Sequence, residues 1–135
     1  MVASSTASPS NRIRVVVADD EAPVRALLGI TLSMERDFQV VGEAADGAEA
    51  VEMIIDRHPD AVVLDLMMPV LAGLEAIPKI RECCPGCRIV VFSALSADQA
   101  ESDALSRGAD AYVEKTRFVT ELCDTLHRVC DRTAA

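Results

Sequence analysis

The sequence has no tryptophan, one tyrosine and three phenylalanines, so aromatic residues make up only 3% of its 135 positions. Proteins that bind single-stranded nucleic acids stack the bases on aromatic side chains, which are scarce here. Basic residues are also few, because 13 Lys and Arg stand against 22 Asp and Glu, a formal net charge of −9. That charge repels phosphate backbones and anionic lipids. We therefore expect no direct binding to nucleic acid or to a membrane by these residues.

Long apolar runs and regularly paired cysteines are missing as well. No hydrophobic run approaches the roughly 18 residues that a membrane-spanning helix needs. The opening MVASSTASPSN has no apolar stretch and does not resemble a signal peptide. The five cysteines are odd in number and irregularly spaced, which favours reduced thiols over a disulfide framework. These features predict a cytoplasmic protein.

The chain does contain enough hydrophobic residues, 50% of the total, for the core of one domain. From Ile13 onward, short β-branched runs alternate with segments whose apolar residues recur every three or four positions. This alternation predicts an α/β fold with a doubly wound, five-stranded parallel sheet and helices on both faces. The expected strands are residues 13–18, 38–44, 61–66, 88–94 and 111–115. We expect one domain at 13–130, with tails at 1–12 and 131–135.

The expected helices can be placed by the spacing of their apolar residues. The first has a stripe made of Val24, Leu27, Leu28 and Leu32. The third, from Gly73 to about Cys83, contains Pro78, which lacks an N–H and clashes with the preceding turn. We expect a kink or a late start in that helix.

Polar residues stand where the expected strands end. Asp19 and Asp20 follow the first strand, Asp65 lies on the third, and Ser93 and Lys115 end the fourth and fifth. Ligands of such a sheet bind beyond the carboxyl ends of its strands, so these residues should meet there if the first and third strands are neighbours. Three carboxylates repel one another without a cation, and Mg²⁺ suits them because it prefers oxygen and accepts a phosphoryl oxygen. The pattern therefore predicts phosphoryl transfer to a carboxylate, with the lysine and hydroxyl holding the oxyanion.

In this order, these residues resemble the receiver domains of bacterial two-component response regulators of the chemotaxis-regulator kind. The resemblance spans residues 13 to about 128 and rests on VVVADDEAPVR, DLMMPVLAGLEA, VVFSA, the run 108–112 and Lys115. It implies a flavodoxin-like strand order of 2-1-3-4-5. Thr116 stands where many members have proline, a variant common in the branch with LuxR-type helix-turn-helix output domains.

The resemblance also implies a role for each polar residue of the pattern. Asp65 is the expected phosphoacceptor, and Lys115 is expected to pair with a phosphoryl oxygen. The expected ligands of Mg²⁺ are Asp19, Asp20, Asp65 and the backbone carbonyl of Met67. The protein is then a switch and not a conventional enzyme, with at most self-phosphorylation and autodephosphorylation.

The resemblance also implies a conformational change on signalling and a set of partners. Ser93 is expected to hydrogen-bond to the phosphoryl group, and Tyr112 to turn inward into the space that Ser93 leaves. The implied phosphoryl donor is a sensor histidine kinase or a phosphotransfer protein. A homodimer of the phosphorylated form is also implied, as is a DNA-binding output domain if the natural chain is longer.

Two other functions fit parts of the pattern. A phosphatase with an aspartyl nucleophile usually needs another Asp two positions on as general acid, and Met67 occupies that position. A pure interaction module with a vestigial site is disfavoured by the complete set of acidic pair, acceptor, hydroxyl and lysine.

Cys84 and Cys87 have the C-x-x-C spacing of redox motifs and zinc sites. A redox pair normally begins a helix, whereas this pair follows one, at the sheet edge away from the carboxylates. A zinc site would need two further ligands, for which the candidates are Cys83, Cys123, His127 and Cys130. A redox or metal role is therefore disfavoured, and Cys123 and Cys130 are expected in or beside the core.

Overall fold

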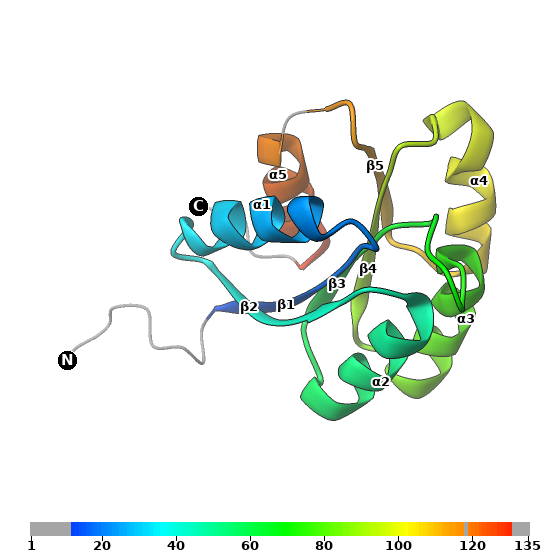
Figure 1. Cartoon of the computed structure of the whole chain (residues 1–135), viewed down its shortest axis with the longest axis horizontal. Coiled ribbons are helices and arrows are strands. Elements are labelled where there is room, and N and C mark those ends of the chain that lie inside the picture. Colours follow the sequence, from blue (N-terminus) through cyan, green and yellow to red (C-terminus); the bar gives the residue numbers. More distant parts are fainter. Residues whose placement is uncertain (1–11, 118, 131–135) are drawn as a thin grey trace.

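The computed structural model describes residues 12–117 and 119–130, in which five parallel strands form one sheet in the order β2-β1-β3-β4-β5 (Figure 1). The strands are β1 (Ile13–Ala18), β2 (Phe38–Ala44), β3 (Ala61–Leu64), β4 (Arg88–Ser93) and β5 (Ala111–Glu114). The helices are α1 (Ala22–Ser33), α2 (Gly47–Arg57), α3 (Gly73–Cys83), α4 (Ala97–Arg107) and α5 (Val119–Val129). The predicted flavodoxin-like fold is confirmed. Apart from Arg12, the predicted tails lie outside the described residues.

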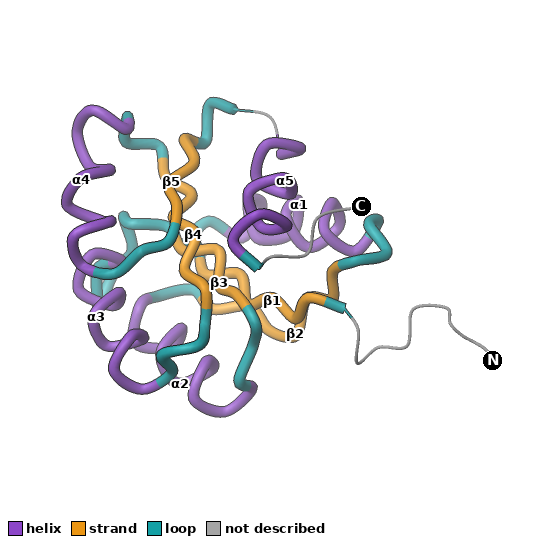
Figure 2. Tube along the Cα trace, turned by 180° about the vertical axis from the view of Figure 1, so that it is seen from behind, coloured by secondary structure: helices purple, strands orange, loops and turns teal. Residues whose placement is uncertain are grey.

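Helices cover both faces of the sheet, as Figures 1 and 2 show from opposite sides. α1 and α5 pack on one face, and α2, α3 and α4 pack on the other. The central strands β1, β3 and β4 are nearly continuous valine, isoleucine and leucine because both of their faces are buried. Full burial of one such side chain stabilises the fold by about 1.5–3 kcal/mol. No helix in the described ranges is long and apolar enough to cross a membrane.

The predicted strands and helices differ from the structure in two respects. β3, β4 and β5 end two, one and one residues earlier than predicted, because the chain turns out of the sheet to reach its carboxyl edge. In α1, Leu28 and Leu32 are buried while Leu27 is 55% exposed. Residues four apart share one line along a helix, and that line passes through 24, 28 and 32 but not 27.

Pro78 lies inside α3, which nevertheless begins at Gly73, so the alternative of a late start is wrong. Proline has no N–H to donate to the carbonyl four residues earlier, that of Leu74. Nη1 of Arg107 on α4 donates to that carbonyl at 3.3 Å. A neighbouring helix thus supplies a donor that the proline lacks.

Arg81, in the last turn of α3, joins several segments at the amino edge of the sheet. Its guanidinium donates to the carbonyls of Pro85, Cys87 and Gly108 at 2.7–2.9 Å and pairs with the carboxylate of Asp110. Gly108 ends α4 with φ +121°, and a Cβ there would lie 2.7 Å from Cγ of Arg81. The ends of α3 and α4 are therefore fixed to the segments that lead into β4 and β5.

Candidate functional site

Main-chain hydrogen bonds set the predicted polar residues on one rim, at the carboxyl ends of the strands. The N–H groups of Asp19, Asp65 and Lys115 donate to the last residue of a neighbouring strand at 3.0, 2.9 and 2.7 Å. β1 pairs directly with β3, which is the condition under which the sequence predicted this convergence. The sheet ladder therefore places the three side chains side by side.

Three carboxylates meet at this rim. Ligand oxygens of Asp19, Asp20 and Asp65 lie within 4.8 Å of one another. Asp19 and Asp65 are 1% and 4% exposed, whereas Asp20 is open to solvent. Asp20 and Asp65 border a pocket of about 300 Å³ whose lining also includes Met67, Ala94 and Lys115. Small Ala94 leaves access to Asp65 from this pocket.

Lys115 supplies the positive charge of the site. Its Nζ lies 2.7 Å from Oδ2 of Asp19, 3.4 Å from Oδ2 of Asp65 and 3.7 Å from Oε1 of Glu21. Burial disfavours the ammonium, but the hydrogen bond to Asp19 and the charge of Asp65 outweigh burial and raise the Lys115 pKa. The lysine thus stays protonated beside the two buried carboxylates.

One lysine does not neutralise the three carboxylates. Burial and the charge of Asp19 raise the pKa of Asp65, although Met67 N–H donates to Oδ1 of Asp65 at 3.2 Å. A cluster of oxygen donors with uncompensated negative charge is what a hard divalent cation prefers. The donor set of Asp19, Asp20 and Asp65 therefore fits Mg²⁺.

Ser93 and Tyr112 lie beside the rim and are joined through one loop. Oγ of Ser93 accepts from the N–H of Leu95 at 3.1 Å, and the hydroxyl of Tyr112 donates to the carbonyl of Leu95 at 2.8 Å. Burial raises the pKa of the Tyr112 phenol, and a hydrogen bond with Ser93 opposes that effect. Both side chains thus contact the β4–α4 loop, and this loop leads directly into the first turn of α4.

Glu21 was not singled out from the sequence, although it lies at the mouth of the pocket. It follows the acidic pair directly, so a run of three acidic residues was the available signal. Its contact with Lys115 adds a third carboxylate around the ammonium.

Comparison with known proteins decides the family. The family model of the response regulator receiver domain matches residues 15–127. The chain belongs to the response regulator receiver domain family. The nitrate/nitrite response regulator protein NarL of Escherichia coli is 38% identical over 114 residues, which cover 84% of this chain and 53% of NarL. This receiver chain spans about half the length of the curated relatives that it matches.

Solved structures agree with this assignment. The signal receiver domain of the putative response regulator NarL from Mycobacterium tuberculosis is 31% identical, with a TM-score of 0.85 and coverage of 91% of this chain and 99% of that one. A DNA-binding response regulator of the LuxR family from Staphylococcus aureus is 25% identical, with a TM-score of 0.82 and coverage of 87% and 98%. The resemblance seen in the sequence, including its LuxR branch, is confirmed.

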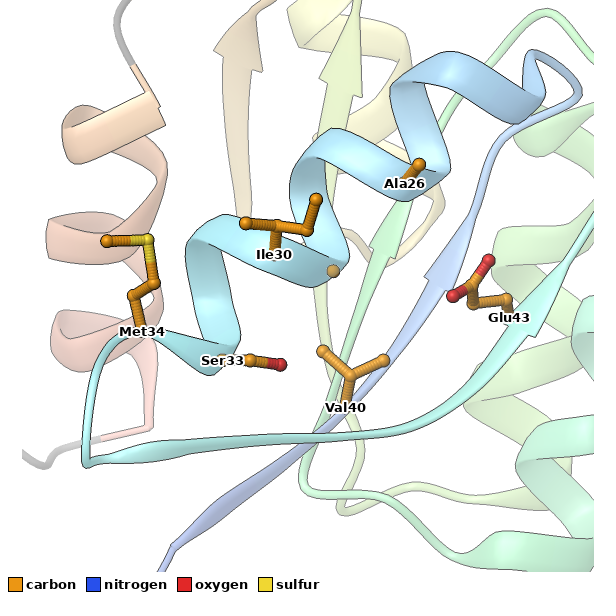
Figure 3. Close-up of a pocket in the computed structure, with 7 residues that line it drawn as sticks. Ala26, Ile30, Ser33, Met34, Val40 and Glu43 are labelled. Carbon is orange, nitrogen blue, oxygen red and sulfur yellow. The ribbon is translucent and has the colours of Figure 1, made fainter.

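A larger hollow, of about 670 Å³, lies between α1 and β2 of this receiver domain (Figure 3). Its lining is mostly apolar and includes Ala26, Ile30, Met34 and Val40, with Glu43 at one side. One carboxylate without a second charged partner in the lining cannot hold a cation or perform acid–base chemistry in concert. The smaller pocket at Asp65 is therefore the candidate site.

The C-x-x-C pair has no ligand geometry in this receiver domain. Within residues 12–117 and 119–130, groups able to hold a metal ion gather only at Asp19, Asp20 and Asp65. Burial raises the pKa of the Cys87 thiol to about 12, and a neutral thiol is a poor nucleophile and metal ligand. Cys123 is buried in the core, as expected.

Replacing Asp65 with Asn is expected to raise the free energy of unfolding of the metal-free protein at pH 7. The folded-state pKa of Asp65 lies above its ordinary value of 3.8, so deprotonation costs stability as pH rises from about 4. Asn removes that cost, and Lys115 keeps Asp19 as its partner. Urea denaturation with a chelator at several pH values measures the gain, which should vanish below pH 4. A gain that grows toward acid pH would contradict the proposed cause.

Proposed function

We propose that this receiver domain is a phosphorylation-controlled switch that accepts a phosphoryl group on Asp65 in a Mg²⁺-dependent reaction. One observation carries the proposal: Asp65 is almost fully buried yet borders an open pocket, with two further carboxylates and Lys115 around it. A buried carboxylate beside a lysine and a cation site suits nucleophilic attack on phosphorus.

The proposed transfer exchanges the P–N bond of the donor for a P–O bond to Asp65. A carboxylate oxygen of Asp65 forms a bond to phosphorus while the P–N bond of a phosphohistidine donor breaks. The imidazole nitrogen keeps the electron pair and takes up a proton, and the product is an acyl phosphate on Asp65. Lys115 stabilises the negative charge on the transferred group, as a fixed cation does in other phosphoryl transfers.

The residues proposed to hold the cation are Asp19, Asp20, Asp65 and the backbone carbonyl of Met67. Bound Mg²⁺ supplies Lewis-acid neutralisation of the oxygen charges during transfer. The carboxylates of Asp19 and Asp20 would hold the cation beside Asp65 and are not themselves phosphorylated.

Ser93 and Tyr112 are proposed to pass the modification on to the surface. Ser93 donates its hydroxyl to a phosphoryl oxygen and gives up its bond with Leu95, and Tyr112 turns into the space that Ser93 leaves. The contacts that support this step are those of both side chains with the β4–α4 loop. A phosphoryl group shifts the population of the two arrangements because it bonds to one of them better.

The partners follow from this chemistry. We propose a sensor histidine kinase or a phosphotransfer protein as donor, a homodimer of the phosphorylated form, and residues 13–130 as the receiver unit between tails at 1–12 and 131–135. Because the S. aureus neighbour is a DNA-binding response regulator, we propose a DNA-binding output domain as partner if the natural chain is longer. The site of action is proposed to be the cytoplasm.

Intact-mass spectrometry after incubation with Mg²⁺ and acetyl phosphate tests this function. We expect one phosphoryl adduct on the wild type, and none on Asp65→Asn or when Mg²⁺ is removed. Asp56→Asn, which changes an exposed carboxylate on α2, is the matched control and should keep the adduct. Continuous release of phosphate without an adduct would support a phosphatase, and neither adduct nor release would support a pure interaction module.

A further inference from the structure

Glu114, the last residue of β5, contacts the first residue of α4 across the loop. It stands opposite Ser93 in the strand register, and its Oε2 accepts from the N–H of Ala97 at 2.6 Å. The first N–H groups of a helix have no partner inside the helix. A carboxylate placed there makes a charge-assisted hydrogen bond and interacts favourably with the helix dipole.

The first turn of α4 already has a local cap, so the contact with Glu114 is not needed to cap the helix. The side-chain oxygen of Gln99 accepts from the N–H of Ser96 at 3.2 Å, within the first turn. Glu114 is 17 residues away from Ala97 and belongs to another element. Its bond therefore fixes the start of α4 relative to β5, which a local cap cannot do.

Glu114 is also next in the chain to Lys115, the lysine at the phosphoacceptor. Nζ of Lys115 lies 3.4 Å from Oδ2 of Asp65, while the preceding carboxylate binds Ala97. Lys115 directly follows β5, so the residue that reaches the site and the residue that holds Ala97 are consecutive in the chain. A shift of the main chain at Lys115 thus moves the acceptor of the Ala97 hydrogen bond.

We propose that Glu114 is a positioning residue that couples the end of β5 to the first turn of α4, so that α4 moves when Lys115 engages a phosphoryl group. This role deepens the proposed function and rests on it for its trigger. It gives Asp65 a second route to α4, through Lys115 and Glu114, beside the route through Ser93 and Tyr112. Without the Glu114 carboxylate, the β4–α4 loop takes up the shift and α4 stays in place.

Amide NMR spectra of the full chain, recorded before and after addition of Mg²⁺ and beryllofluoride as phosphoryl mimic, test this coupling. The amides of Met67 and Lys115 report binding at the site, and those of Ala97 to Ala100 report movement of α4. In Glu114→Leu we expect an unchanged response at the site and a fall of about threefold or more in the response of α4. Glu114→Gln keeps an oxygen acceptor and should restore most of that response.

Glu52→Gln, which removes a charge from an exposed position on α2, is the control and should respond like the wild type. If leucine prevents folding, which the same spectra reveal, Glu114→Ala removes the acceptor with a smaller side chain. A full α4 response in the leucine or alanine variant, beside a normal response at Met67, would overturn the coupling role alone. If the Met67 and Lys115 amides of the wild type show no change on addition of the mimic, both the proposed function and the coupling are overturned.

Discussion

Gly73→Ala is expected to lower the free energy of unfolding by about 3 kcal/mol, because the start of α3 packs directly on the segment that carries Asp65. An added Cβ would lie 2.3 Å from the carbonyl oxygen of Asp65 and 2.7 Å from Cα of Leu66. Both are main-chain atoms, so the clash is relieved only by moving α3 or Asp65. The better helix propensity of alanine offsets less than about 1 kcal/mol of this cost. Urea denaturation measures the change, and phosphorylation by acetyl phosphate should slow as Asp65 shifts.

Gly86→Ala is the matched control for this prediction. A Cβ at Gly86 would have no neighbouring atom within 4 Å, so the variant should match the wild type or gain up to about 1 kcal/mol from the stiffer unfolded chain. Equal stabilities of the two alanine variants would show that α3 does not pack on Asp65 as closely as described.

Lys115→Ala is expected to keep Mg²⁺ binding while losing most of the response to phosphorylation. The Lys115 ammonium contacts Oδ2 of both Asp19 and Asp65. Its removal frees these oxygens for the cation, so Mg²⁺ binding should become several-fold tighter. The same removal takes away a fixed cation from the transferred group, which costs about 100-fold in the rate of phosphorylation. Titration with Mg²⁺ and the rate of adduct formation by mass spectrometry give the two quantities separately.

Lys79→Ala serves as the charge-matched control, since Lys79 is exposed on α3 and is not among the residues that line the pocket at Asp65. It should leave both the Mg²⁺ affinity and the phosphorylation rate close to those of the wild type. Weaker Mg²⁺ binding in Lys115→Ala would mean that the lysine organises the carboxylates instead of competing with the cation for them.

The sheet and its rim could be predicted from the sequence because the signals are local and strong. Unbroken runs of β-branched residues identify the buried strands, and a charged residue directly after such a run identifies the rim, as with Asp65. The order of the strands came from family resemblance, and the pairing of β1 with β3 confirms it. Strand ends were predicted less well, because the turn out of the sheet depends on packing and not on composition.

Contacts between distant segments could not be predicted from the sequence. The bond from Ala97 to Glu114 depends on the register of β5 against β4, which no residue in either segment encodes alone. The donation from Arg107 to Leu74 depends likewise on how α3 and α4 lie together. The bond of Ser93 with its own loop was also not foreseen, since the sequence places a hydroxyl at the strand end but not its direction.

The hydrogen bond from Arg81 to the carbonyl of Gly108 fixes the carboxyl end of α4, which can then act as a pivot. With its carboxyl end tied to α3 and to the segment before β5, this helix of 11 residues can tilt more easily than it can slide. At about 16 Å in length, it would swing by roughly 4° for each ångström that its opposite end travels. The amino end of α4 would then sweep the largest arc, so a partner that distinguishes the two states would do so best by binding there.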